Sequence, residues 1–331
     1  MSWVKSNPET KESFRNFIRK ILLQREFVLI AIIVLFSLVF SLKFNNFLSI
    51  GNLTATLIGM SCDAIIAIGM CMLLITGEMD LSVGSVFALA GTVTGLALAT
   101  EWPVPLAILA GIFIGLLIGF INAFVIDKLK VNFFIATLGM MQIVRGIAVI
   151  LAEGGIAFLP IEFTRIGQNT LLGFQLPVWF MLIFLIIFGV LLAKHRFFRQ
   201  LYYIGGNAKA ATLSGINVSK MRFFTYTIVG GLSALAGILS TARFGAAIST
   251  AGTGAEMRVI AASVIGGCSL AGGEGSISGI FLGTVFMALI SSALVTANIS
   301  VYWQSIVTGL VLICAVAFDT WINHNRISFQ K

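Results

Sequence analysis

Long apolar runs alternate with short polar segments along almost the whole of this chain. Most of the runs are close to the ~20 residues that a helix needs to cross the hydrocarbon core of a bilayer. They are continuous, without the alternation of apolar and polar positions that is typical of a transmembrane β-barrel. We predict transmembrane helices at Phe27–Leu42, Ala55–Thr76, Val83–Thr100, Val104–Ile126, Phe133–Ala152, Pro177–Ala193, Phe223–Thr241, Met257–Ala271, Ser276–Thr296 and Val301–Phe318.

The pattern predicts an all-α polytopic membrane protein with about ten transmembrane helices and one membrane domain. Residues 1–26 form a polar tail, 27–319 form the membrane domain with one long polar loop at 194–222, and 320–331 form a second tail. The eighth predicted span is short and rich in glycine, so we expect it to be broken or re-entrant. Hydrophobic residues make up 58% of the chain, charged residues only 10%, and the mean hydropathy is +1.03, values that exclude a soluble domain of this size.

The basic residues predict the orientation of the chain in the membrane. Sixteen of the 21 Lys and Arg residues lie in segments on one side of the predicted membrane, four lie on the other side, and Arg145 lies within a span. Positive charge gathers in cytoplasmic segments, so both tails and the 194–222 loop are predicted to be cytoplasmic. The net charge of +8 therefore reflects membrane orientation, and we expect no nucleic-acid partner.

One polar segment, Leu201 to Arg222, is predicted to contact another protein. Asn207 can cap a short helix over Ala208 to Ser214, and Gly215 can end it in the left-handed conformation. A helix of about two turns is too short to be stable alone, so it must dock on something. We interpret the segment as a cytoplasmic coupling element that is exposed in the isolated chain and buried against a partner.

Small-residue ridges predict close helix packing at two places. Glycines recur four residues apart in the fourth predicted span and again at the start of the ninth, namely at Gly111, Gly115, Gly119, Gly275, Gly279 and Gly283. Such a ridge lets a neighbouring backbone approach closely. The neighbour can be another helix of the same chain or a second subunit.

No catalytic constellation is present in the sequence. Both histidines, His195 and His324, lie in predicted cytoplasmic segments, and neither has a partner at the spacing of a metal-binding motif. The chain also lacks the Gly-x4-Gly-Lys-Ser/Thr phosphate loop. We therefore expect no enzyme activity, no metal site and no cofactor on this chain, and if ATP drives it, another chain must bind the ATP.

Charged and polar residues within or at the spans are candidates for a translocation path. A charge in hydrocarbon costs about 2.5–3.5 kcal/mol on insertion scales, so it usually faces a bundle interior or a cavity. Each candidate can instead form a helix–helix ion pair or cap, and either Ser82 or Asp80 is well placed to cap the third span. The candidates are Asp63, Glu78, Asp80, Gln142, Arg145 and Ser269.

Five stretches in fixed order resemble a known family. They are ITGEMDLSVGS (75–85), TLGMMQIVRG (137–146), IGGNAKAATLSGINV (204–218), VIGGCSLAGGEGSISG (264–279) and WQSIVTGLVLICAVAFD (303–319). Together they resemble the inner-membrane permease subunits of bacterial ABC importers for ribose, arabinose, xylose and related sugars. The resemblance covers the chain from about residue 27 to 319.

The resemblance implies partners and roles that composition does not. It implies a second permease subunit, identical or different, a cytoplasmic ATP-binding subunit that carries ATP and Mg²⁺, and a periplasmic binding protein that delivers the sugar. It also implies alternating access in the bacterial inner membrane. Arg145, Glu78 and Asp80 fall on family motifs, with the role of the acidic pair left open. The residues of the coupling loop, which would dock on the ATPase, are Gly205, Gly206, Asn207, Ala210, Ala211, Ser214 and Gly215.

A proton-coupled secondary sugar transporter is the alternative. It would need a titratable relay within the membrane, and Asp63 is the one carboxylate well inside a predicted span. Neither interpretation identifies the sugar.

Overall fold

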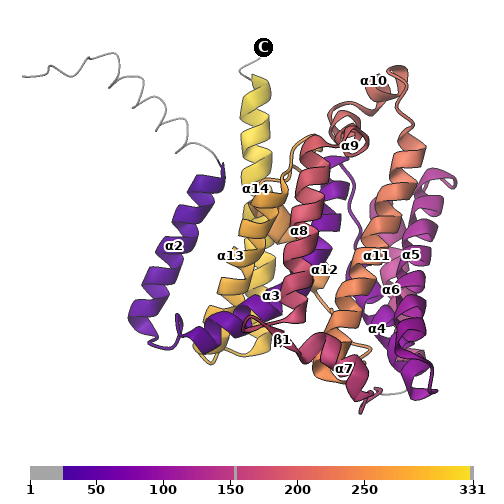
Figure 1. Ribbon diagram of the computed structural model, residues 1–331. Coiled ribbons are helices and arrows are strands. Elements are labelled where there is room, and N and C mark those ends of the chain that lie inside the picture. Colours follow the sequence, from indigo (N-terminus) through magenta and orange to yellow (C-terminus); the bar gives the residue numbers. More distant parts are fainter. Residues whose placement is uncertain (1–24, 153–154, 329–331) are drawn as a thin grey trace, which may run out of the picture.

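A computed structural model describes residues 25–152 and 155–328, so most of the predicted N-terminal tail lies outside the described residues. Figure 1 shows long helices standing roughly side by side, with the short helix α10 at one end of the bundle and α7 at the other. We call these the α10 end and the α7 end. The helices are α2 (Arg25–Lys43), α3 (Ile50–Ile75), α4 (Val83–Ala99), α5 (Val104–Asp127), α6 (Phe133–Ala152), α7 (Ile161–Gln168), α8 (Leu176–Lys194), α9 (Arg196–Gly206), α10 (Ala208–Leu213), α11 (Val218–Phe244), α12 (Ala255–Ile265), α13 (Ile277–Thr296) and α14 (Val301–Ser328).

The two strands, β1 (Thr170–Leu171) and β2 (Phe174–Gln175), form a small antiparallel hairpin between α7 and α8. Among the described residues, seven helices are long and apolar enough to cross a membrane: α2, α3, α5, α6, α8, α11 and α13. Two shorter apolar helical stretches occur in α4 and in α14. The chain is therefore a helical protein with several membrane-capable helices, as its hydrophobic pattern predicts.

The eighth predicted span differs from the others. Helix α12 ends at Ile265, six residues before the predicted end at Ala271, and residues 266–276 continue as a loop to α13. Eleven residues at 1.5 Å each make a helix of about 16 Å, roughly half of the ~30 Å hydrocarbon core. Three glycines in the loop, Gly267, Gly272 and Gly273, have positive φ angles of 94°, 88° and 79°, which keep the backbone of the loop out of a helical path.

Helix α3 forms the centre of the bundle. Its residues from Ala64 to Ile75 are buried, and it packs against α8, α11, α12 and α13. Many apolar side chains on α2, α5, α6, α8 and α14 are instead exposed on the outside of the bundle. This distribution suits a helical protein whose outer surface faces lipid rather than water.

Glycine ridges bring the helices into backbone contact within the chain. A Cβ atom on Gly119 of α5 would lie 2.2 Å from the carbonyl oxygen of Tyr226 in α11, and one on Gly283 of α13 would lie 1.9 Å from that of Ala262 in α12. No side chain fits at such distances, so both positions require glycine. Both predicted ridges thus pack inside the chain, α5 on α11 and α13 on α12.

Three segments meet at the α10 end. Helix α9 lies against the end of α3, since a Cβ atom on Gly205 would lie 1.8 Å from the carbonyl oxygen of Ile75. The same carbonyl accepts a 2.8 Å hydrogen bond from the backbone N–H of Gly273. The hydroxyl of Tyr202 on α9 donates to the carbonyl of Gly275 at 2.9 Å. Helix α9 is thereby seated on α3 and on the 266–276 loop, with α10 directly after it.

Candidate functional site

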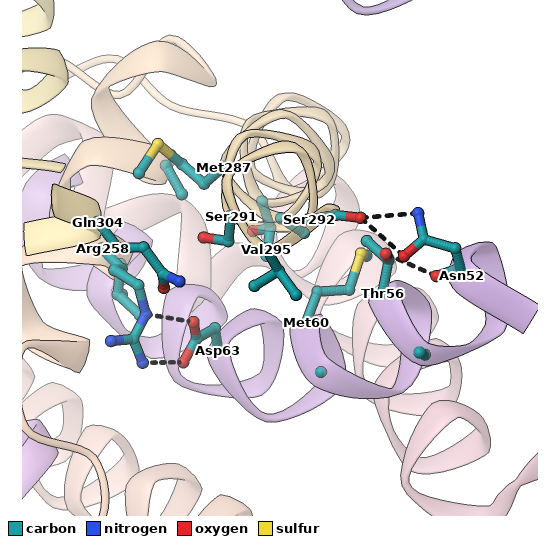
Figure 2. Close-up of a pocket in the computed structure, with 16 residues that line it drawn as sticks. Asn52, Thr56, Met60, Asp63, Arg258, Met287, Ser291, Ser292, Val295 and Gln304 are labelled. Atoms are coloured by element: carbon teal, nitrogen blue, oxygen red, sulfur yellow. Dashed lines mark hydrogen bonds and ion pairs between the residues drawn. The ribbon is translucent and has the colours of Figure 1, made fainter. Parts of the chain in front are cut away.

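A polar pocket opens between α3, α12, α13 and the first turn of α14 (Figure 2). Its volume is about 380 Å³. We call it the α3–α13 pocket. Alanine, methionine and valine side chains form its apolar part, and its polar lining consists of Asn52, Thr56, Asp63, Arg258, Thr284, Ser291, Ser292 and Gln304.

Asp63 and Arg258 form an ion pair across this pocket. The Nε and Nη2 atoms of Arg258 donate to the two carboxylate oxygens of Asp63 at 2.8 and 3.1 Å, a bidentate geometry. The side chains retain 32% and 25% of their exposure, so water and solutes can reach them. The pair joins the middle of α3 to the first turn of α12 and leaves no net charge in the pocket.

A second hollow lies on the other side of the ion pair. Its volume is about 410 Å³, and it is lined by the end of α11, the 245–254 loop and part of α4. Gly59, Asp63 and Arg258 line both hollows. The ion pair therefore lines both hollows.

The chemistry of the α3–α13 pocket suits an uncharged, hydroxylated solute. The carboxylate accepts hydrogen bonds, the guanidinium donates them, and the amides and hydroxyls do both. Asn52 and Ser292 already hydrogen-bond to each other at 2.9 Å, which keeps both groups satisfied without a solute. None of the described residues that line the pocket is aromatic, so a solute would be held by polar contacts and by aliphatic and methionine side chains, without stacking on a ring. Among the residues that the structure describes, no group of three or more His, Cys, Asp or Glu side chains could hold a metal ion.

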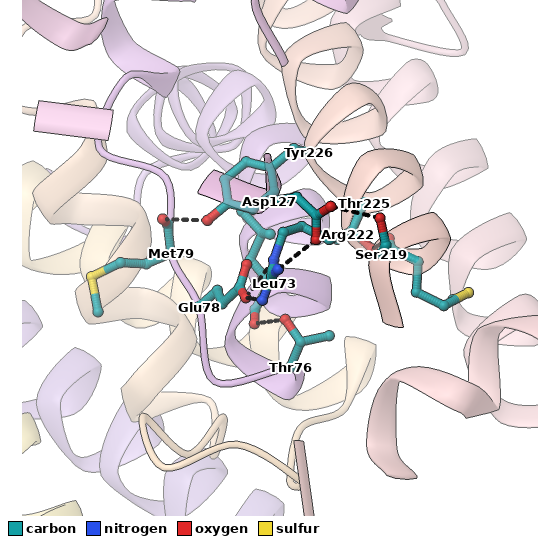
Figure 3. Close-up of polar contacts among 10 residues, drawn as sticks. Leu73, Thr76, Glu78, Met79, Asp127, Ser219, Arg222, Thr225 and Tyr226 are labelled. Carbon is teal, nitrogen blue, oxygen red and sulfur yellow. Dashed lines mark hydrogen bonds and ion pairs between the residues drawn. The ribbon is translucent and has the colours of Figure 1, made fainter. Parts of the chain in front are cut away.

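A second group of charges lies at the α10 end (Figure 3). Arg222 of α11 donates from Nε to Glu78 at 2.8 Å and from Nη1 to Asp127 at 2.9 Å. The hydroxyl of Ser219 donates to the other oxygen of Asp127 at 2.7 Å. The exposed fractions of the Arg222, Glu78 and Asp127 side chains are 23%, 13% and 7%. We call these three residues the Arg222 cluster; it ties α11 to the end of α5 and to the 76–82 loop between α3 and α4.

Asp80 is buried and has a local structural role. Its carboxylate accepts hydrogen bonds from the backbone N–H and hydroxyl of Ser82 at 2.7 and 2.6 Å and from the amide of Asn122 at 3.1 Å. Burial raises the pKa of this carboxyl above its ordinary value, while the bonds from Ser82 and Asn122 lower it. Asp80 thus organises the turn before α4 and its contact with α5. It does not cap α4, because it bonds to the N-cap residue Ser82 and no side chain of the described residues makes the cap hydrogen bond.

The remaining candidates for a path lie away from the α3–α13 pocket. Arg145 of α6 donates from Nη1 to the carbonyls of Ser249 and Ala251 at 2.7 and 2.9 Å, which holds the 245–254 loop. Gln142 is exposed on α6, and Ser269 is buried in the 266–276 loop, where its hydroxyl accepts from the N–H of Ala271. Of the six predicted residues, all of which the structure describes, Asp63 is the one that lines this pocket.

The partners of the acidic residues were not apparent from the sequence. The sequence analysis assigned neither Arg258 nor Arg222 to a carboxylate. A signal existed, because a carboxylate at a helix end or within a span requires a compensating charge. Sequence alone did not say which arginine supplies it.

The predicted coupling helix is present and largely exposed. The Asn207 side chain accepts from the N–H of Ala210 at 3.0 Å and caps α10, and Gly215 has a φ of 85° after its end. Leu213 is 91% exposed, whereas Ala211 is buried. The predicted docking residues that face away from the chain are Gly206, Asn207, Ala210, Ser214 and Gly215.

Two of the predicted docking residues pack within the chain instead. Gly205 lies against the carbonyl of Ile75, and Ala211 faces inward, where its carbonyl accepts from the N–H of Ile216 at 3.0 Å. A substitution at either position therefore changes internal packing as well as any contact with a partner.

Comparisons with known proteins give a consistent result. Residues 52–316 match the family described as branched-chain amino acid transport system / permease component. The chain is 37% identical over 309 residues to the ribose import permease protein RbsC of Haemophilus influenzae, covering 92% of this chain and 95% of the relative. It is 32% identical over 306 residues to the L-arabinose ABC transporter permease protein AraH of Azospirillum brasilense, covering 92% and 90%.

A third relative is the autoinducer 2 import system permease protein LsrC of Salmonella choleraesuis, 35% identical over 292 residues that cover 88% of this chain and 84% of the relative. No solved structure matches the chain.

Proposed function

The chain belongs to this family of transport-system permease components, and on that premise we propose that it is the membrane subunit of an ATP-driven, binding-protein-dependent importer of a sugar or sugar-like solute. As a permease component it is a multi-pass transport subunit and not itself an enzyme. The finer points, namely the solute, the partners and the orientation, are part of the proposal.

The α3–α13 pocket is the observation that carries the proposal. It is a polar hollow beside the central helix of an otherwise apolar bundle, and the Asp63–Arg258 pair cancels its charge. A neutral polyol can form hydrogen bonds with these polar groups as it passes. The charge of an ionised solute would instead remain uncompensated in a pocket without net charge. Relatives across most of the chain's length are named for ribose and L-arabinose, which are solutes of this class.

The orientation and partners follow from the two ends of the bundle. The α10 end carries most of the basic segments, so we place it in the cytoplasm of a bacterial cell, with both termini and about ten spans in the inner membrane. An ATP-binding subunit would dock on α10, a periplasmic binding protein on the α7 end, and a second permease subunit beside this one. ATP binding and hydrolysis on the partner would move α10 and switch the bundle between two packings.

The proton-coupled alternative loses its main support. It needed Asp63 as a free carboxylate that takes up and releases a proton. Asp63 instead accepts hydrogen bonds from Nε and Nη2 of Arg258, so its two carboxylate oxygens are engaged in a bidentate ion pair. Among the described residues, no specific observation favours a proton relay.

Reconstitution tests the proposed function. The chain is placed in liposomes with its ATP-binding subunit and binding protein, and uptake of labelled ribose, arabinose and xylose is measured with ATP present or absent. We expect concentrative uptake of at least one sugar that requires ATP and both partners. The same liposomes without the ATP-binding subunit are the control. Concentrative uptake that survives ATP removal and stops when the proton gradient is collapsed would overturn the proposal.

A further inference from the structure

We propose that Arg222 is a positioning residue that transmits movement of the coupling segment to α3 and α5, so that breaking its ion pairs uncouples ATP hydrolysis from uptake. This inference rests on the proposed function, because it assumes that an ATP-binding subunit moves α10. It concerns the Arg222 cluster at the α10 end and leaves the chemistry of the α3–α13 pocket unchanged.

The first link joins α10 to the start of α11 through a tight connection. Four residues, 214–217, separate the two helices. Ser214 donates its N–H to the carbonyl of Ala210 at 3.0 Å, Gly215 adopts a left-handed φ of 85°, and Ile216 donates to Ala211. The Asn217 side chain then caps α11 by accepting from the N–H of Lys220 at 2.9 Å. A displacement of α10 therefore carries the first turn of α11 with it.

The second link is Arg222, one turn further along α11. Its planar guanidinium reaches two carboxylates on two other elements, Glu78 of the 76–82 loop and Asp127 at the end of α5. Figure 3 shows the Arg222 side chain lying between these two acidic side chains. Arginine holds a fixed fork of donors, so these bonds specify where the three elements stand relative to one another.

The third link leads from the 76–82 loop to the pocket. Glu78 follows the end of α3 at Ile75 by three residues, and α3 carries Asp63 twelve residues before that end, about 18 Å along the helix axis. The hydroxyl of Tyr226, one turn beyond Arg222 on α11, donates to the carbonyl of Met79 in the same loop at 3.2 Å. The loop is thus held to α11 at two adjacent residues, and a shift of α11 moves the helix on which the pocket is built.

The surroundings argue for a rigid joint. The space beside Glu78 and Arg222, between Leu73, Ile204 and Met221, has a volume of only about 10 Å³. The hollow is too small to hold a solute, and the ion pairs and hydrogen bonds between the three elements join them.

A buried cluster of charges could also serve stability alone, and the experiment must separate the two roles. Replacing every member of a buried ion cluster by neutral residues of similar size often preserves stability, whereas removing one partner leaves buried charges unpaired. The triple variant Glu78→Gln, Asp127→Asn, Arg222→Met therefore keeps the packing and removes the ion pairs. Arg222→Lys keeps the positive charge but lacks the planar guanidinium whose separate N–H groups reach both carboxylates.

The measurement is uptake per ATP hydrolysed, in liposomes that contain the complete importer. Lys220→Met is the matched control, because Lys220 is an exposed basic residue two positions away, with no ion pair to a described residue. We expect the triple variant to assemble and to hydrolyse ATP at a rate within about twofold of the unmodified importer, with uptake per ATP at least tenfold lower. Arg222→Lys should show a smaller fall in the same ratio, and Lys220→Met should show none.

The inference would be overturned if the triple variant assembles and its uptake per ATP hydrolysed equals that of the unmodified importer. If the triple variant fails to assemble, the same result in Arg222→Lys would overturn the inference. A reconstituted unmodified chain without ATP-dependent uptake would instead contradict the proposed function. The two failures are therefore distinguishable.

Discussion

The two ion-paired sites of this protein use the same side-chain chemistry in opposite surroundings. At the α10 end, Arg222 bonds to Glu78 and Asp127 with 7–23% of these side chains exposed, and the hollow beside Glu78 and Arg222 has a volume of only about 10 Å³. In the polar pocket, Arg258 bonds to Asp63 with 25–32% exposed and hollows of about 380 and 410 Å³ on either side. The former cannot rearrange without leaving buried charges unpaired, while the latter can exchange partners with water or solute. Free space, rather than residue type, separates a structural joint from a candidate site.

Glycines show the same contrast. Gly205, at the α10 end, has no room for a Cβ atom, whereas a Cβ atom on Gly59, which lines both hollows, would meet nothing within 4 Å. The bundle is therefore closely packed where the coupling segment is attached and open where the polar pocket lies.

The largest expected effect on stability comes from removing the positive charge of Arg222 while both acidic residues of the Arg222 cluster remain. Arg222→Met removes the ion-pair partner of Glu78 and leaves Asp127 with Lys128 and the Ser219 hydroxyl, so we expect a loss of about 3–5 kcal/mol in the free energy of unfolding. Thermal unfolding of the purified protein in detergent measures it. Arg258→Met, at the more exposed pair, should cost much less. Equal losses in the two variants would remove the distinction between the sites.

The next largest effect concerns packing at the α10 end. Gly205→Ala places a methyl group on the carbonyl of Ile75, and we expect overpacking to cost about 1–3 kcal/mol. Gly59→Ala is the matched control within α3, and it should be neutral or stabilise the helix by up to about 1 kcal/mol. Melting temperatures of the two variants report both effects, and a stable Gly205→Ala protein would show that α9 is not seated tightly on α3.

The third prediction separates stability from transport at the pocket. Asp63→Asn should cost about 1 kcal/mol or less in stability, because the pair is partly exposed. Initial uptake should fall by about tenfold, since a hydrogen bond to a charged group contributes about 1.5–3 kcal/mol and each 1.4 kcal/mol is a factor of ten. Glu162→Gln, an exposed change on α7, is the control and should alter neither quantity. Unchanged uptake in Asp63→Asn would exclude the pair from the transport path.

The smallest effect on stability is expected on α10. Leu213→Asp changes an exposed side chain, so the free energy of unfolding should stay within about 0.5 kcal/mol. Copurification of the ATP-binding subunit should nevertheless be lost, because the leucine would be buried against it. The control is Leu172→Asp, a similarly exposed leucine at the α7 end, which should retain the subunit. Retention of the subunit by Leu213→Asp would place its docking surface elsewhere.

The predicted local structure around α10 was accurate because short-range chemistry decides it. Asn207 caps the helix and Gly215 follows it in the left-handed conformation, and both roles depend on the residue and its immediate neighbours. The inward orientation of Ala211 and the close contact of Gly205 were not predictable in the same way. The contact of Gly205 depends on α3, which is distant in sequence, and the orientation of Ala211 depends on how α10 packs against α9 and α11.

The candidate site was predicted in part, for the same reason. Asp63 stood out because a carboxylate within a span is costly, and it does line the pocket. Arg145 stood out equally, yet it holds the carbonyls of the 245–254 loop. The insertion cost of a charge reports that it needs a partner, but the same cost applies whether the partner is a carboxylate, a carbonyl or a solute.

By itself, the sequence determined that the chain is helical and membrane-embedded, how its basic segments are distributed, and which family it resembles. These properties depend on composition, on the length of apolar runs and on the order of motifs along the chain, and none of them requires knowledge of which distant residues are in contact. Tertiary structure alone decided that Arg258 pairs with Asp63 beside open space and that Arg222 pairs with Glu78 and Asp127 where no space remains. The physical reason is that the partners lie 95 to 195 residues apart, and packing, which no local pattern encodes, sets both their contact and the free volume around it.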